Sequence, residues 1–125
     1  MKVGCPKEIK PQEFRVGLTP AAVNELVRRG HFVTIETNAG QGAGFVDSDY
    51  EKEGADIVGS AKEVFDKADM IVKVKEPQAI ERKMLKSGQL LFTYLHLAPD
   101  PEQTHDLIES GCTAIAYETV TDVNG

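Results

Sequence analysis

Short apolar runs typical of strands alternate along this chain with segments that carry helix signals. The connections between successive runs are too long for hairpins, so the strands are expected to lie parallel in one sheet. The sequence therefore predicts an α/β fold. Its core is expected to be a parallel, doubly wound sheet of about six strands with helices on both faces, of the Rossmann-like or flavodoxin-like kind.

Local signals give the expected bounds of these elements. Helices are expected after caps at Thr19, at Asp47 or Ser48, at Ser60 and at Asp100, and a short one over roughly 79–85. Proline follows two of these caps directly, and proline is favoured at the first helical position. The expected strands span residues 2–5, 32–36, 56–58, 70–74, 89–94 and 113–117.

The run from Gln89 to Tyr94 is the most informative strand. It is apolar and aromatic and lies between Ser87-Gly88 and Pro99, which predicts a strand buried on both faces of a parallel sheet. His96 follows where this strand ends. In open α/β sheets, ligands bind at the carboxyl ends of the strands.

Ionisable residues follow several of the other strands in the same way. Arg15 lies in the connection after the first strand, Lys75 after the fourth, His96 after the fifth and Glu118 after the sixth. An arginine fork matches a carboxylate, and a lysine ammonium can polarise a carbonyl oxygen or hold a second carboxylate oxygen. Histidine titrates near neutral pH, so His96 is the candidate general acid–base. The sequence predicts a site for a small carboxylic acid at this edge.

More than one role is open to each of three neighbouring side chains. Tyr94 is expected on the same side of its strand as His96, where it either lines the pocket or packs in the core. Glu118 either orients the base, balances charge or forms a simple ion pair. Lys73 is expected to reach solvent or an acidic neighbour.

A glycine-rich loop, NAGQGAG, follows the second expected strand with Gly40, Gly42 and Gly44. A dinucleotide fingerprint needs G-x-G-x-x-G opening a helix, and an acidic residue at the end of the next strand. Here the spacing is G-x-G-x-G, and the next strand ends in Gly59. The pattern favours a tight structural loop over a phosphate-binding one, so no cofactor-binding residues are expected in this chain.

Composition narrows the class of protein further. The length of 125 residues indicates one domain, and a net charge of −6 argues against nucleic acid as a partner. No apolar run approaches the ~18 residues that span a bilayer, and the apolar part of the N-terminus is too short for a secretory signal, so a cytoplasmic protein is expected. The histidines lack metal-ligand spacing, which predicts no metal site. Cys5 and Cys112 are expected to be reduced structural thiols.

Four segments carry a family resemblance that covers essentially the whole chain. PKEIKPQEFRVGLTP, VKVKEP, FTYLHLAP and AIAYETV, in this order, resemble the N-terminal, substrate-binding domain of the alanine dehydrogenase and nicotinamide nucleotide transhydrogenase family. Around the lysine and the histidine the chain is more similar to the dehydrogenases. The resemblance implies NAD-dependent, reversible oxidative deamination of L-alanine to pyruvate and ammonia. It implies that Arg15 and Lys75 hold the substrate carboxylate and carbonyl oxygens and that His96 is the acid–base. Tyr94 and Glu118 are candidate substrate-binding residues because they lie beside these motifs.

The sequence departs from the family in its length. Members of the family carry a second, nucleotide-binding domain that these 125 residues lack. Residues 1–125 are therefore expected to be a truncated substrate-binding domain that is inactive alone, with NAD bound mainly by the missing domain. An exposed apolar face and a homo-oligomer are also expected. The alternatives are a non-catalytic module that binds small carboxylates and a transhydrogenase-type nucleotide domain.

Overall fold

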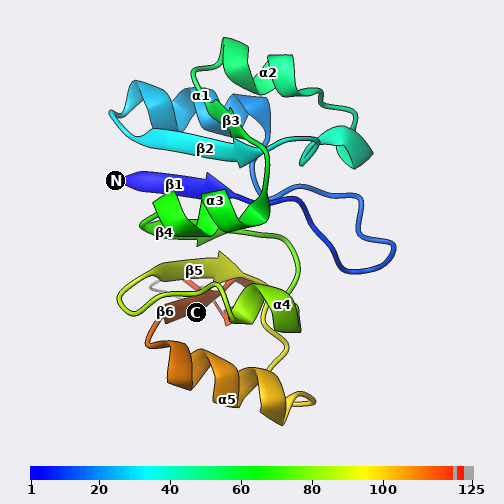
Figure 1. Cartoon of the computed structure of the whole chain (residues 1–125), viewed down its shortest axis with the longest axis vertical. Helices are drawn as coiled ribbons and strands as arrows, with labels where there is room; N and C mark the ends of the chain where they lie inside the picture. The colour runs from blue at the N-terminus through cyan, green and yellow to red at the C-terminus, as the bar shows by residue number, and fades with distance from the viewer. Residues whose placement is uncertain (120, 123–125) are drawn as a thin grey trace.

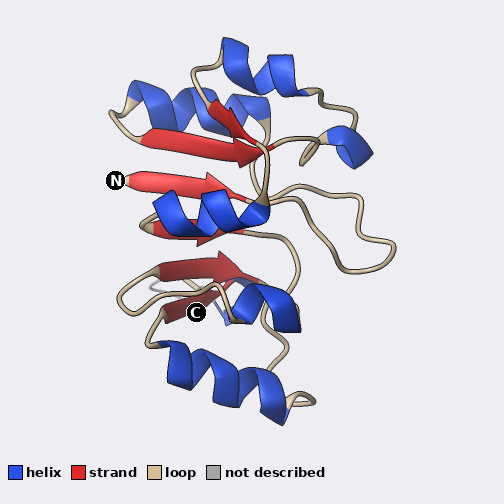
Figure 2. Ribbon diagram, in the orientation of Figure 1, coloured by secondary structure: helices blue, strands red, loops and turns tan. Residues whose placement is uncertain are grey.

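The computed structural model describes residues 1–119 and 121–122, and it contains one sheet of parallel strands (Figures 1 and 2). The six-stranded sheet has the order β3-β2-β1-β4-β5-β6. The strands are β1 Lys2–Cys5, β2 Phe32–Glu36, β3 Asp56–Val58, β4 Met70–Val72, β5 Leu90–Thr93 and β6 Thr113–Ala116. The helices are α1 Pro20–Arg28, η1 Gln41–Ala43, α2 Asp47–Lys52, α3 Ala61–Lys67, α4 Ala79–Arg82, α5 Pro101–Ser110 and η2 Tyr117–Thr119.

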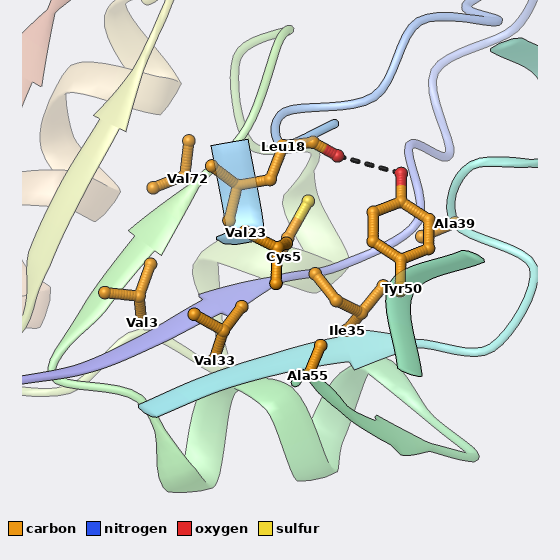
Figure 3. Packing of buried hydrophobic residues seen from close by; sticks show 10 residues of the cluster. All are labelled: Val3, Cys5, Leu18, Val23, Val33, Ile35, Ala39, Tyr50, Ala55 and Val72. Carbon is orange, nitrogen blue, oxygen red and sulfur yellow. Dashed lines mark hydrogen bonds between the residues drawn. The ribbon is translucent and has the colours of Figure 1, made fainter. Parts of the chain in front are cut away.

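Two apolar clusters show that helices cover both faces of the sheet. On one face, Val23 of α1 and Tyr50 of α2 pack on alternate residues of β1 and β2, and the Tyr50 hydroxyl donates to the Leu18 carbonyl at 2.8 Å (Figure 3). On the other face, Val64 of α3 and Leu107 of α5 share a cluster with Leu91 of β5. The predicted doubly wound parallel fold is confirmed.

The expected helix starts are confirmed in three cases and wrong in one. The side chains of Thr19, Ser60 and Asp100 each accept a hydrogen bond from the backbone amide three residues later. Neither Asp47 nor Ser48 is a cap, because α2 begins at Asp47 itself, after Val46. The Asp47 carboxylate accepts instead from Thr37 Oγ1 at 2.5 Å and from the backbone N–H of Asn38 at 2.8 Å.

Several elements are shorter than the sequence predicts. β4 ends at Val72 rather than at residue 74, β5 spans Leu90–Thr93, and β6 gives way to η2 at Tyr117. The short helix α4 ends at Arg82 rather than near residue 85. Apolar or aromatic residues such as Val74, Tyr94 and Leu85 lie within three positions past the ends of these elements, so hydrophobicity alone overestimates the length.

The expectation that β5 is buried on both faces is also wrong for this chain. Leu91 and Thr93 are fully buried, whereas Leu90 and Phe92 on the opposite face are only half-buried. The helices α1 and α2 lie over β2 and β3 (Figure 1), and among the described residues this face of β5 is contacted instead by the single turn η2, whose Tyr117 packs against Phe92.

Both cysteines are free thiols, and Cys5 lies fully buried in the α1 side of the core (Figure 3). Burial raises the pKa of the Cys5 thiol to about 12, which keeps it protonated and unreactive near neutral pH.

Candidate functional site

The candidate site lies where the strand order reverses beside β1. All strands run in the same direction, so their carboxyl ends meet at one edge of the sheet, and the 6–18 connection extends beyond that edge (Figure 1). Gly17 brings this connection against the end of β4, because a Cβ atom there would lie 2.6 Å from the Val72 carbonyl oxygen. The close approach holds Arg15 beside the strand from which Lys75 emerges.

Arg15 is paired with a carboxylate of its own loop. Its Nε donates to Glu13 Oε2 at 3.0 Å and its Nη2 donates to Glu13 Oε1 at 2.9 Å. The hydrogen bonds from Arg15 lower the pKa of Glu13, and the charge of Lys75 adds to the effect. This pairing uses two of the five guanidinium N–H donors, and the Arg15 side chain is 62% exposed. The end of the fork remains accessible to a second carboxylate.

Arg15 lines three cavities: one of about 300 Å³ that Glu8, Glu13 and the glycine-rich loop also line, and two that contain further candidate site residues. Of these two, one has a volume of about 450 Å³ and is lined by the 10–15 segment together with Lys75. The other has a volume of about 360 Å³, and Arg15, Tyr94 and Tyr117 are among the residues that line it. Arg15 therefore belongs both to the cavity that contains Lys75 and to the cavity that contains the two tyrosines.

The backbone that carries Lys75 is held by a buried carboxylate. Glu8, in the connection after β1, accepts from the backbone N–H groups of Val74 at 3.0 Å and of Lys75 at 3.2 Å. Lys73 neutralises this carboxylate through an Nζ–Oε1 contact of 2.9 Å, and it pairs on its other side with Glu81 of α4 at 3.0 Å. Of the two alternatives expected for Lys73, solvent or an acidic neighbour, the second is confirmed.

The charges of this cluster are shielded from water. The side chains of Lys73, Glu8 and Glu81 are at most 2% exposed. Burial lowers the pKa of Lys73, but the two carboxylates outweigh that effect and raise it above its ordinary value. Burial raises the pKa of Glu81, only partly opposed by the charge of Lys73.

His96 has an unusual backbone conformation. Its φ of 50° is in the left-handed region, which non-glycine residues adopt chiefly at turns and functional sites. Glu118 Oε1 accepts from the backbone N–H groups of Leu95 at 3.1 Å and of His96 at 3.3 Å, and Gln103 Nε2 donates to the Leu95 carbonyl at 2.9 Å. Slight burial raises the pKa of Glu118, but the amide donors and His96 outweigh it and lower the pKa overall.

The structure brings the predicted site residues to one edge in a chain of neighbours. Arg15 shares the cavity of about 450 Å³ with Lys75 and the cavity of about 360 Å³ with Tyr94. The Tyr94 ring stacks on the His96 ring, with centroids 6.3 Å apart and planes 21° apart. Glu118 contacts these residues through its carboxylate, which accepts from the backbone N–H of His96. His96 itself lines neither of the two cavities in the described part of the chain.

Sequence reasoning missed Glu8, Glu13 and Gln103. The two glutamates lie in the same polar connection as Arg15, and an acidic residue there is the natural partner for the cations that emerge from β4. Gln103 is buried in α5 with a polar side chain, and only its contact with the 94–96 segment reveals its role.

The glycine-rich loop is packed against its own chain. A Cβ atom at Gly40 would lie 2.6 Å from the Tyr50 hydroxyl, and one at Gly42 would lie 2.9 Å from the Phe14 carbonyl oxygen. Gly44 has a φ of 90°, and the loop forms only the single turn η1. Packing accounts for Gly40 and Gly42, the left-handed φ accounts for Gly44, and no long helix begins here, so the loop lacks the features of a diphosphate-binding turn.

Among residues 1–119 and 121–122, no group of histidine, cysteine and acidic side chains could hold a metal ion. In the same residues, no helix has the length and apolar character that crossing a bilayer requires.

Known proteins resemble this chain over its full length. It is 52% identical over all of its residues to an alanine dehydrogenase of Halomonas elongata, of which it covers 34%, and 51% identical over 98% of its length to one of Bacillus subtilis, of which it covers 32%. The chain thus spans about a third of the length of these relatives.

Solved structures agree with these relatives. An L-alanine dehydrogenase superposes with a TM-score of 0.96 at 56% identity, and this chain covers 34% of it. A transhydrogenase from Sinorhizobium meliloti superposes with a TM-score of 0.91 at 31% identity, and 35% of it is covered. Both matches cover 99% of this chain.

The protein family that matches residues 4–125 is described as alanine dehydrogenase/PNT, N-terminal domain. The match includes Arg15, Lys75, Tyr94, His96 and Glu118. The resemblance inferred from the four sequence segments is confirmed, and the chain belongs to the alanine dehydrogenase/PNT N-terminal domain family.

Proposed function

We propose that this chain is the substrate-binding domain of an NAD-dependent L-alanine dehydrogenase. The observation that carries the proposal is the shared cavity of Arg15 and Lys75 at the carboxyl edge of the sheet. A volume of about 450 Å³ accommodates a three-carbon acid, and two cations around it match a carboxylate with an adjacent carbonyl. Relatives about 50% identical that are named alanine dehydrogenase support the choice of substrate.

Arg15 and Lys75 have complementary tasks in this proposal. The free end of the Arg15 fork binds the substrate carboxylate in two parallel hydrogen bonds, while Glu13 holds the other side of the guanidinium. Lys75 donates to the carbonyl oxygen of pyruvate and stabilises negative charge that develops there. Tyr94 contributes an aromatic wall beside Arg15.

His96 carries out the proton transfers. When water adds to the iminium carbon of the oxidised substrate, the imidazole accepts a proton from that water. The same proton then passes to the amino group of the carbinolamine. As the C–N bond breaks, ammonia leaves, the hydroxyl oxygen becomes the carbonyl oxygen of pyruvate, and His96 accepts the hydroxyl proton. Glu118 supports these steps by fixing the backbone of His96 rather than by touching the substrate.

Hydride transfer requires a nicotinamide, and the glycine-rich loop of this chain has neither the spacing nor the helix of a dinucleotide-binding loop. We therefore propose that NAD is bound mainly by the portion of the relatives that extends beyond this chain. The steps assigned to these 125 residues are substrate binding and proton transfer. The two free thiols support a reducing, cytoplasmic location.

A chimaeric enzyme tests the proposal directly. In it, this chain replaces the matched residues of the Halomonas elongata relative, with which it shares 52% identity. The chimaera is expected to form NADH from L-alanine and NAD, and an Arg15→Ala chimaera is expected to lose that activity. The 125-residue chain alone is expected to form none. A folded chimaera without alanine-dependent NADH formation would contradict the assignment.

The match to a transhydrogenase supports a second candidate, a domain that contacts a nicotinamide nucleotide without alanine chemistry. Calorimetric titration of NAD into the chain distinguishes the two. Tight binding that is insensitive to Lys75→Ala and His96→Ala favours the transhydrogenase reading. Calorimetric binding of pyruvate that needs Arg15 and Lys75 but not His96, together with a chimaera that is inactive towards alanine, favours a non-catalytic carboxylate-binding module.

We also propose that the chain associates with a second copy through the open face of β5 and β6. Phe92 and Ile115 are neighbours in the strand register, and Tyr117 packs edge-on against Phe92 and Tyr94. Ile115 is 40% exposed and Tyr94 is 36% exposed, which leaves an apolar strip facing solvent.

Ile115→Lys is expected to weaken self-association, because a charge in the middle of an apolar contact must be desolvated. Sedimentation velocity over a range of concentrations measures the change. Ile108→Lys is the matched control, since Ile108 is 75% exposed on α5, outside the strip. A wild-type chain that stays monomeric at high concentration would contradict the proposal.

A further inference from the structure

The Glu8 carboxylate joins the two parts of the chain that carry the cations of the candidate site. Glu8 lies in the connection that continues to Arg15, whereas its hydrogen-bond donors lie at the end of β4. Arg15 and Lys75 are 60 residues apart in sequence. Their separation in space therefore depends on contacts between these two segments.

Glu8 accepts hydrogen bonds from the backbone that carries Lys75 and from the side chain of Lys73. Its Oε2 accepts from the backbone N–H of Val74, and its Oε1 accepts from that of Lys75 and from Lys73 Nζ. β4 ends at Val72, so the amides of Val74 and Lys75 lie beyond the regular strand and need another acceptor. A buried, charged acceptor forms stronger and more directional bonds than a neutral one.

We infer that Glu8 is a positioning residue for the proposed reaction: its carboxylate fixes the Lys75 backbone relative to Arg15, so that both cations reach one substrate. This inference rests on the proposed function. Lys73 has a supporting part, because its ammonium compensates the charge of the buried Glu8 carboxylate.

Two variants that make the same change in buried charge can separate a positioning role of Glu8 from a contribution to stability. The cluster of Glu8, Lys73 and Glu81 contains two carboxylates and one ammonium. Either Glu8→Gln or Glu81→Gln leaves one carboxylate paired with Lys73, so both variants make the same change in buried charge. Only Glu8→Gln affects the amides of Val74 and Lys75, because a glutamine side chain has one acceptor oxygen where the glutamate had two.

The test compares these two variants in the chimaeric enzyme during reductive amination of pyruvate. Glu8→Gln is expected to raise the KM for pyruvate about ten-fold and to leave the KM for NADH within about two-fold of wild type. Glu81→Gln is expected to leave the KM for pyruvate within about two-fold. Unfolding by urea shows whether the two variants are equally stable, and amide NMR of the chain shows whether the Val74 and Lys75 resonances move only in Glu8→Gln.

Each outcome bears on one conclusion. Equal KM values for pyruvate in wild type and Glu8→Gln, with an active wild-type chimaera, would overturn the positioning role and leave the proposed function intact. An increase of the same size in Glu81→Gln would also overturn it, because the effect would then follow from buried charge alone. A folded wild-type chimaera without alanine-dependent activity would instead overturn the proposed function.

Discussion

Lys73→Met is expected to lower the free energy of unfolding of this chain by about 3–5 kcal/mol. The substitution keeps most of the side-chain volume but removes the ammonium that lies between Glu8 and Glu81. Two carboxylates then remain buried without a compensating charge, and each has lost a partner within 3.0 Å. Urea unfolding followed by circular dichroism at neutral pH measures the loss.

An exposed ion pair provides the control. Lys62 pairs with Asp66 at 2.7 Å one turn along α3, but their side chains are 75% and 50% exposed. Lys62→Met is expected to leave the urea midpoint close to that of wild type, because solvent screens the pair. A Lys73→Met variant as stable as Lys62→Met would show that the buried cluster does not depend on its ammonium.

The cost of Lys73→Met is expected to depend on pH. Burial already raises the pKa of Glu81, and removal of Lys73 takes away the charge that opposes this effect. A carboxyl whose pKa is higher in the folded state than in the unfolded state stabilises the fold while it is protonated, and this contribution is lost as pH rises through the folded pKa. The variant should therefore be closer to wild type in mildly acidic buffer than at neutral pH, as the same urea titrations would show.

The parts of the fold that depend on local signals could be predicted from the sequence. Thr19-Pro20 and Asp100-Pro101 act within one helical turn. The hydrogen bonds that Thr19 and Asp100 accept from backbone amides therefore follow from the local residues alone. The parallel order of strands follows from the lengths of the connections. The prediction that Asp47 caps its helix was wrong because its carboxylate accepts hydrogen bonds from the 37–38 turn instead of from its own helix. The sequence does not show which of the two sets of donors the carboxylate binds.

The candidate site could be predicted only in outline. Residues that follow strand ends must lie at one edge of a parallel sheet, which placed Arg15, Lys75 and His96 in the same region. The contacts of Glu8 with Lys73 and with the Lys75 amide join residues more than 60 positions apart, and no periodicity records such a pair. The pairing of Arg15 with Glu13 is local, but residue types alone do not distinguish a partner from a bystander.

The backbone of His96 determines how its role should be tested. Alanine at this position would combine loss of the imidazole with the strain of a φ of 50°. Asparagine adopts the left-handed region more readily than other non-glycine residues, so His96→Asn removes the titrating ring and keeps the turn. The hydrogen bonds of the 95–96 backbone with Glu118 and Gln103 do not involve the imidazole ring, so they are expected to remain in His96→Asn.

His96→Asn is expected to lower kcat of the chimaeric enzyme with L-alanine by about 10²–10⁴-fold, the usual contribution of a positioned general acid–base. The KM for L-alanine should change little, since Arg15 and Lys75 remain, and the urea midpoint should stay near that of wild type. His105→Asn is the matched control, because His105 is an exposed histidine on α5 that pairs only with Glu109 of the same helix among the described residues. An unchanged kcat in His96→Asn would remove His96 from the proton transfers, because the variant loses the imidazole while the fold and the cations are retained.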